Sequence, residues 1–239
     1  MKDTCVLITG ATKGIGWALS QKLADQGCHV VCIARNTAEI DFPGYLYECD
    51  LSDAGQTEEV LRTIRDKFPV DAVVNNVGSA ISQPLGSVDL SVLFETFDLN
   101  VRTAVQVTQA FIESMKARRA GRIVNLCSLS ARGARDSTSY AAAKSAIIGC
   151  TLTWALELAA YGITVNAVAP GAIDTEMLMH ATPGKDVAQQ QGTQVPLGRL
   201  GSANEVAALI AFLLSADAGF ITGQVIGIDG GGSLAGVPA

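Results

Sequence analysis

Cys5-Val-Leu-Ile-Thr9 is followed at once by Gly10-Ala-Thr-Lys-Gly14-Ile-Gly16. The first part is a short apolar run that predicts a buried β-strand, and a helix is predicted to follow from about Ile15 to Gln26. Glycines allow a chain to turn sharply and to approach a phosphate, and the free N–H groups at a helix start attract anions. Strand, glycine-rich turn and helix in succession are the context required of a dinucleotide-binding loop.

Apolar runs and turn residues place further strands and helices along the chain. Strands are predicted at residues 29–34, 45–49, 70–75, 121–127, 163–168 and 225–229, and helices at about 53–67, 89–117, 140–161 and 204–214. About ten residues join the second strand to the third, whereas a parallel crossover normally takes a dozen or more and contains a helix. We therefore expect this connection to hold a turn in place of the helix.

Length, charge and composition limit the classes of protein that the sequence fits. Its 239 residues, 49% of them hydrophobic, suffice for one large domain or two small ones. A net charge of −6 speaks against nucleic acid as the main partner. The sequence has no run of about 18 apolar residues and no signal-peptide pattern after Met1, so we expect a cytoplasmic protein that does not enter a membrane.

Cysteine and histidine usage argues against a metal site. Six cysteines lie within apolar strand or helix patterns without a Cys-x-x-Cys pair, and His29 and His180 are the only histidines. We therefore predict free thiols in the core and no bound metal. Cys127, beside Ser128, is the one candidate for a reactive thiol.

Ser128 and the pair Tyr140 and Lys144 indicate proton-transfer chemistry. The tyrosine and the lysine are four residues apart, so they share one face of a predicted helix. Free tyrosine has a pKa of about 10, and an adjacent lysine cation is expected to lower it toward neutrality, where a phenol can act as acid or base. The surrounding helix is apolar almost all round, and a buried lysine needs a reason. The alternative is a surface pair on an amphipathic helix.

Seven motifs together give the sequence a specific resemblance. They are Thr9-Gly10-x-x-x-Gly14-x-Gly16, Asn75-Asn76-Val77-Gly78, Asn100, Ser128, Tyr140-x-x-x-Lys144, Pro170-Gly171 and the closing Gly223-Gln-Val-Ile-Gly-Ile-Asp229-Gly-Gly. In order and rough spacing they resemble the motifs of the short-chain dehydrogenases/reductases, and residues 196–232 look most like the 3-oxoacyl-carrier-protein reductase branch. The resemblance implies a single domain over residues 1–239 with a doubly wound, Rossmann-type α/β fold. Its seven-stranded parallel sheet would have helices on both faces and the strand order 3-2-1-4-5-6-7.

The resemblance also implies a nicotinamide cofactor, and Arg35 indicates which one. Relatives that bind NAD usually have an aspartate after the second strand, whereas an arginine pairs with the 2′-phosphate of NADP, and Lys13 adds a second cation. We therefore predict NADP(H); two solvated surface charges are the alternative. The predicted cofactor-binding residues are Gly10, Thr12, Lys13, Gly14, Ile15, Gly16, Arg35, Asp50, Leu51, Asn76, Gly78, Tyr140, Lys144, Pro170, Gly171, Ile173 and Thr175.

The catalytic roles follow from the same resemblance. Tyr140 would protonate the oxygen of a ketone, Ser128 would hydrogen-bond that oxygen, and Lys144 would lower the tyrosine pKa and bind the nicotinamide ribose. Asn100, a poor residue for the middle of a helix, would bend the helix and hold a water that connects the lysine to solvent. Ser130 is a rival hydroxyl, although the family register favours Ser128.

The predicted reaction is the NADPH-dependent reduction of a ketone to a secondary alcohol, with a 3-oxoacyl thioester as the first candidate. An acidic carrier could meet five arginines, which are Arg118, Arg119, Arg122, Arg132 and Arg135; solvated surface charges are the alternative. One alternative is the oxidation or reduction of a small cyclic alcohol, ketone or dihydrodiol. A more remote one is a cofactor-sensing protein without catalysis.

Two further features concern assembly and substrate access. The helix that ends near Tyr161 is apolar almost all round, which predicts a subunit interface and, by resemblance, a homotetramer; core packing on both faces is the alternative. Residues 176–199 include several Met and Leu and are predicted to form a mobile lid over an apolar part of the substrate.

Overall fold

A seven-stranded parallel sheet forms the centre of the computed structural model, which describes residues 1–38, 40–181 and 192–234. Its strand order is β3-β2-β1-β4-β5-β6-β9. The strands are β1 (Cys5–Thr9), β2 (His29–Ala34), β3 (Tyr45–Glu48), β4 (Ala72–Asn75), β5 (Gly121–Leu126), β6 (Ile163–Pro170) and β9 (Val225–Ile228). The predicted α/β fold and strand order are confirmed.

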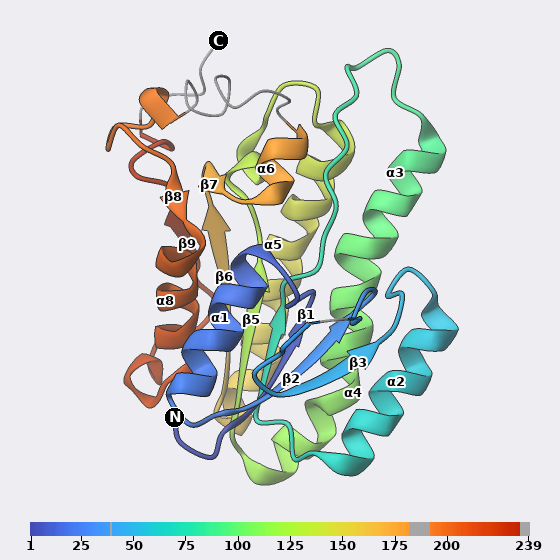
Figure 1. The fold of residues 1–239 in the computed structure, drawn as a ribbon, viewed down its shortest axis with the longest axis vertical. Helices are drawn as coiled ribbons and strands as arrows, with labels where there is room; N and C mark the ends of the chain where they lie inside the picture. The colour runs from blue at the N-terminus through green and yellow to red at the C-terminus, as the bar shows by residue number, and fades with distance from the viewer. Residues whose placement is uncertain (39, 182–191, 235–239) are drawn as a thin grey trace.

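Helices cover both faces of the sheet (Figure 1). On one face α1 (Gly14–Asp25) packs against α8 (Ala203–Leu214), and on the other lie α2 (Ala54–Lys67), α4 (Thr103–Arg118) and α5 (Thr138–Leu158). Strands such as β1 and β4 are therefore buried on both sides, which explains why their sequences are continuous apolar runs rather than alternating ones.

Side-chain caps define the starts of two of these helices. Asp53 precedes α2, and its carboxylate accepts hydrogen bonds from the N–H groups of Gly55 and Gln56, both at 2.9 Å. Ser202 and Glu205 form a capping box at the start of α8. Both caps satisfy backbone N–H groups that have no hydrogen-bond partner inside the helix, so each helix begins directly after the residue that caps it.

The helix predicted at 89–117 changes its geometry near its middle. α3 (Leu90–Phe97) and α4 are joined by a π-helical turn at Asp98–Arg102, which carries Asn100. π turns are rare and frequently lie at functional sites. The predicted long helix is therefore confirmed from Leu90 to Arg118, and its departure from α geometry falls where the resemblance implies a bend.

The connection from β2 to β3 contains no helix in its described residues, 35–38 and 40–44, so the expected turn is confirmed. Gly44 brings this link against β2, because a Cβ there would lie 2.2 Å from the carbonyl oxygen of Val30. Phe42 packs on Trp17 of α1, with ring centroids 6.2 Å apart. A close backbone approach and one aromatic contact therefore hold the short link in place.

A second, two-stranded parallel sheet closes the end of the molecule at which the central strands finish. β7 (Ile173–Asp174) pairs with β8 (Gly201–Ser202), and α6 (Glu176–Ala181) follows β7. The lid predicted at 176–199 falls in part on residues 182–191, which lie outside the described residues. Within the described ranges, no helix has the length and apolar character needed to cross a bilayer.

Candidate active site

A cleft of about 1890 Å³ lies at the C-terminal ends of the parallel strands. Its walls come from the segments that follow β1 to β6, which is where open parallel sheets bind their ligands. Pockets for one small ligand are commonly about 300–1,000 Å³, so this cleft has room for a dinucleotide and a substrate. Of the predicted site residues, all except Gly16 and Asn100 line it.

The glycine-rich loop has the geometry that a phosphate-binding turn requires. Gly10 and Gly14 have positive φ angles of 69° and 55°, which other L-residues rarely adopt. A Cβ on Gly16 would lie 2.6 Å from the carbonyl oxygen of Gly10, so a side chain there would push the loop and the helix apart. The loop therefore fits the pyrophosphate of a dinucleotide held at the start of α1.

Asn76 holds the glycine-rich loop in place through hydrogen bonds to the loop backbone. Its side-chain amide donates to the carbonyl oxygens of Thr9 and Gly10, both at 2.9 Å, and the backbone N–H groups of Asn76 and Val77 donate to the Thr9 hydroxyl at 3.0 Å. The amide is thus engaged with the protein backbone. Asn76, predicted as a cofactor-binding residue, acts on the loop itself and fixes its conformation.

Two cations, Arg35 and Lys13, line the cleft and could meet a 2′-phosphate. Arg35 follows β2 and faces Asp50, whose pKa is lowered mainly by hydrogen bonds from Ser52 and further by the Arg35 charge. The Lys13 ammonium lies 2.9 Å from the carboxylate of Glu176 at the start of α6. Glu176 was not predicted as a site residue, because no local sequence pattern reports a contact across the cleft.

Arg102 is a second feature that the sequence did not indicate. Its guanidinium donates to the carbonyl oxygens of Leu51 at 2.7 Å and Ser52 at 3.2 Å, and it pairs with Asp98. These bonds join the π turn to the segment after β3, which forms the adenosine-side wall of the cleft. Arg102 therefore connects the adenosine end of the cleft to the turn that carries Asn100.

Ser128, Tyr140 and Lys144 come together in the middle of the cleft. Ser128 ends the segment after β5 and caps a 3-10 helix at Leu129–Arg132, while Tyr140 and Lys144 lie on successive turns of α5. The lysine is 4% exposed; its ammonium donates to the carbonyl oxygen of Leu126 at 2.8 Å and lies 5.6 Å from the Tyr140 ring centroid. The expectation of a buried lysine is confirmed.

The Ser128 hydroxyl is the one that reaches the tyrosine. A hydrogen bond between Ser128 and the Tyr140 phenol lowers the pKa of the phenol, whereas Ser130 donates its backbone N–H to the Ser128 oxygen at 3.1 Å. Ser130 thus orients Ser128. This arrangement favours Ser128 over Ser130 as the hydroxyl beside the reacting oxygen.

The pKa values of the pair differ from the expectation. Burial raises the pKa of Tyr140, and the Ser128 hydrogen bond opposes this without reversing it. Burial also lowers the pKa of Lys144 to about 8. The protein's own groups therefore favour a neutral phenol, and the predicted lowering of the tyrosine pKa by Lys144 is wrong for this arrangement.

Asn100 and Lys144 face one another beside Gly78. The Asn100 amide nitrogen donates to the carbonyl oxygens of Thr96 at 2.9 Å and Ser79 at 3.1 Å. Its buried Oδ1 has no hydrogen-bond partner within the described part of the chain. A Cβ on Gly78 would lie 2.5 Å from this oxygen and 3.3 Å from the Lys144 ammonium, so both polar atoms converge on that point. Such a site suits one bridging water.

Comparison with known proteins gives the family. Residues 10–233 match the family model described as enoyl-(acyl carrier protein) reductase. The 3-oxoacyl-[acyl-carrier-protein] reductase of Thermotoga maritima is 37% identical over 237 residues, which cover 94% of this chain and 96% of that protein. This chain is a short-chain dehydrogenase/reductase. It is an NADP-dependent oxidoreductase of carbonyl and alcohol groups, as its resemblance implied.

Solved structures of the family agree with the described fold. The crystal structure of levodione reductase has a TM-score of 0.93 and 30% identity, over 99% of this chain and all of that chain. The structure of ElxO with NADP bound has a TM-score of 0.89 and 31% identity, over 99% of this chain and 100% of the other. The cofactor of the second structure matches the prediction from Arg35 and Lys13.

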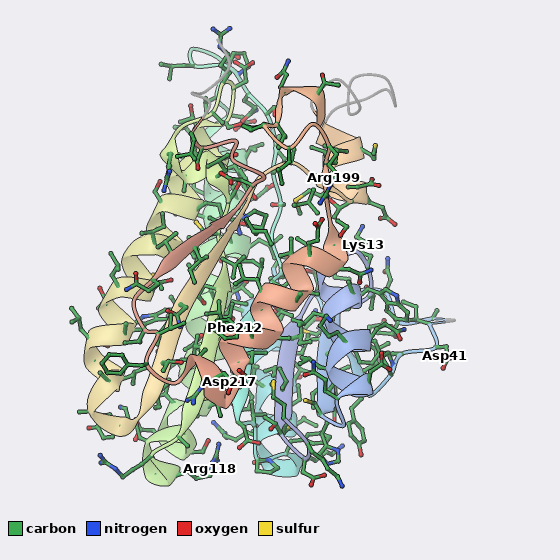
Figure 2. All side chains as sticks on the ribbon, turned by 90° about the vertical axis from the view of Figure 1, so that its left-hand side faces the viewer. Lys13, Asp41, Arg118, Arg199, Phe212 and Asp217 are labelled. Atoms are coloured by element: carbon green, nitrogen blue, oxygen red, sulfur yellow. The ribbon has the colours of Figure 1, made fainter. Side chains whose placement is uncertain are left out.

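The five arginines of this short-chain reductase do not form one surface. Arg118 ends α4 and donates to the carbonyl oxygen of Val70, at the end of the sheet where the strands begin. Figure 2 shows Arg118 far from Lys13, which marks the cleft. Arg119 and Arg122 belong to the same end, whereas Arg132 lines the cleft. A carrier placed over the cleft of one chain would therefore meet only part of this set.

Cys127 is not a reactive thiol in this reductase. Its side chain is buried, and burial raises its pKa, so the nucleophilic thiolate is disfavoured at neutral pH. All six cysteines are free, and five of them are buried, as predicted for core thiols.

Proposed function

We propose that this short-chain reductase transfers a hydride from NADPH to the ketone of a 3-oxoacyl thioester and releases a secondary alcohol. The observation that carries the proposal is the convergence of Ser128, Tyr140 and buried Lys144 beside the glycine-rich loop. The name of the Thermotoga maritima relative supports a carrier-bound 3-oxoacyl group as the substrate. A panel of thioesters tests this choice.

NADPH, when bound through the glycine-rich loop, Arg35 and Lys13, would supply the hydride to the ketone carbon. Tyr140 donates its phenolic proton to the ketone oxygen, and Ser128 holds that oxygen by a hydrogen bond. Because burial keeps the phenol protonated, the tyrosine is in the state that reduction needs before the reaction starts.

The proton lost by Tyr140 is replaced through the groups beneath it. Lys144 lies under the tyrosine ring, and Asn100 presents a buried oxygen toward the lysine across Gly78. A water at the point where they converge would pass a proton from solvent to the lysine and then to the phenolate. Asn100 positions this relay, because the carbonyl oxygens of Thr96 and Ser79 hold its amide nitrogen and leave its oxygen toward the lysine.

Exchange of Tyr140 for phenylalanine tests the assignment. Tyr140→Phe removes the proton donor and keeps the ring, so NADPH affinity should stay unchanged while kcat falls about 100-fold or more. Tyr161→Phe, in the 3-10 turn after α5, is the matched control and should keep full activity. Retention of more than a tenth of the wild-type kcat in Tyr140→Phe would overturn the assignment.

A small free ketone is the second candidate substrate. A levodione reductase is among the solved relatives, and the described residues of the link between β2 and β3 contain no helix, which leaves the adenosine side of the cleft more open. Turnover of small cyclic ketones with no turnover of acetoacetyl thioesters would select this candidate. The opposite result would select the thioester.

We also propose a homotetramer in the cytoplasm. The outer face of α5 exposes Leu152 and Leu156, the latter to 83%, and two large apolar side chains one turn apart suit a second copy of the chain. Six free cysteines suit a reducing compartment.

A further inference from the structure

We propose that Arg132 binds an anionic group of the substrate, so that the preferred ketone has an apolar body and carries a carboxylate or a phosphate. This inference rests on the proposed function, because it concerns the same cleft and names the class of ketone that enters it. It assigns to one arginine of this chain a role in choosing the substrate.

Arg132 lies close to the reacting groups and on a fixed backbone. It ends the 3-10 helix that Ser128 caps, and four residues of such a helix span about 8 Å. The Ser145 hydroxyl of α5 donates to the carbonyl oxygen of Ala131 at 2.8 Å, and the Gly133 N–H donates to Ser130 at 3.0 Å. The guanidinium is therefore presented to the substrate half of the cleft from an anchored position.

The charge of Arg132 is not paired with that of another residue in the part of the chain that the structure describes. Its guanidinium makes no hydrogen bond or ion pair within the described part of the chain. Most acidic groups of the cleft wall already have partners: Asp50 accepts from Ser52, Asp98 pairs with Arg102, Glu176 pairs with Lys13, and Asp229 accepts from Gly231 and Ser233. Glu95, on α3, is the remaining carboxylate of the wall.

The cofactor does not account for this cation. Its phosphates belong beside the glycine-rich loop and Arg35, which follow β1 and β2. Arg132 follows β5, on the other side of Ser128 and Tyr140 from the adenosine end. A guanidinium with five donors in a planar fork matches a carboxylate or a phosphate, so the anion it fits belongs to the substrate.

Apolar side chains line the same cleft. Ile81, Phe94 and Met177 are cleft residues whose side chains are substantially exposed, at 45%, 69% and 46%. Exposed apolar surface inside a cleft favours an apolar ligand, because its burial removes that surface from water. The cleft thus combines an apolar wall with one unpaired cation, which suits an amphipathic anion.

Matched pairs of ketones test the inference. The first pair is an aryl ketone bearing a carboxylate and its methyl ester; the second is acetoacetyl-coenzyme A and neutral acetoacetyl-N-acetylcysteamine. For each pair, the ratio of kcat/KM for the anion to that for the neutral member is measured in wild type, Arg132→Gln and Arg135→Gln. Arg135 is an exposed arginine of the same loop that does not line the cleft, so it controls for the loss of one charge.

We expect the ratio to fall about tenfold in Arg132→Gln, the loss of one charge-assisted contact, and to stay unchanged in Arg135→Gln. A lower kcat/KM ratio for the first pair identifies a carboxylate as the anion, and a lower ratio for the second pair alone identifies a phosphate. Equal ratios in wild type and Arg132→Gln, or equal effects of the two variants, would overturn the inference.

Binding separates this inference from the proposed function. In the Tyr140→Phe protein loaded with NADPH, quenching of NADPH fluorescence gives the dissociation constant of the keto acid and of its ester without turnover. If wild type reduces none of the four ketones, the proposed function fails. The inference is still decided by whether adding Arg132→Gln weakens the binding of the keto acid relative to its ester.

Discussion

A methyl group added at Gly78 tests the contact between Asn100 and Lys144. A Cβ at this position would lie 2.5 Å from the Asn100 Oδ1 and 3.3 Å from the Lys144 ammonium. Both atoms are buried, and the lysine is also held by the carbonyl oxygen of Leu126, so neither side chain can swing into solvent. Gly78→Ala therefore has to displace the asparagine amide, the lysine or the backbone that carries them.

The expected cost has a structural and a catalytic part. Overpacking of a buried site costs about 1–3 kcal/mol of unfolding free energy, and most of it should appear here because the 2.5 Å contact is far below van der Waals distance. Displacement of catalytic groups by about 1 Å can cost about 100-fold in rate, so kcat should fall about 10- to 100-fold. The alanine also fills the point where a bridging water would lie, which interrupts the proton relay.

The assay measures kcat with a 3-oxoacyl thioester, the dissociation constant of NADPH, and the unfolding free energy by urea titration. Gly55→Ala is the matched control, because its Cβ meets only the exposed Asp53 carboxylate, at 3.3 Å. The control should keep kcat and stability close to wild type. A Gly78→Ala protein with wild-type kcat would refute the reasoning, since the two polar atoms would then not need to converge beside Gly78.

Three further predictions concern other parts of the molecule. Arg102→Ala removes the hydrogen bonds that hold the segment after β3, so it should raise the KM for NADPH about tenfold with little change in kcat. Arg118→Ala is the control: it breaks a similar bond far from the cleft and should leave the KM unchanged. Because burial lowers the pKa of Lys144 from 10.5 to about 8, the unfolded chain binds this proton more tightly. The stability of wild type relative to Lys144→Met should therefore rise by up to about 3 kcal/mol between about pH 7 and about pH 11. A difference in unfolding free energy between the two proteins that stays constant over this pH range in urea titrations would contradict this. Leu156→Glu should split the assembly in light scattering, whereas Leu85→Glu, equally exposed but on the loop before α3, should not.

Most elements could be predicted because they depend on local signals, whereas the strand order followed from the family resemblance. The glycine turn after β1 and the apolar runs of the strands are each readable within a few residues. The missing helix between β2 and β3 followed from chain length alone. The site residues that line the cleft belong to motifs at strand ends, where a parallel sheet gathers them at one edge.

The features that the sequence did not reveal depend on distances between elements. The ion pair of Lys13 with Glu176 joins residues 163 positions apart, and Arg102 reaches a carbonyl 51 positions away. The π turn shifts the backbone hydrogen bonds of the helix by one residue, and the spacing of apolar residues in the sequence does not indicate such a shift. The pKa of Tyr140 was expected to be lowered because the lysine was considered without the burial that surrounds both groups.

Lys13, Lys144 and Arg132 are three basic residues of the cleft whose surroundings give them different roles. Lys13 is exposed and paired with Glu176, so it can exchange this partner for another anion at a cost of about 1 kcal/mol or less. Lys144 is buried without a carboxylate among the described residues, so its charge is costly and its pKa falls near the range where it can pass a proton. Arg132 keeps its charge at any working pH and has no partner within the described residues, so it can only contribute binding energy. Burial and pairing, together with the fixed charge of arginine, therefore separate cofactor binding, proton transfer and substrate choice along a single cleft.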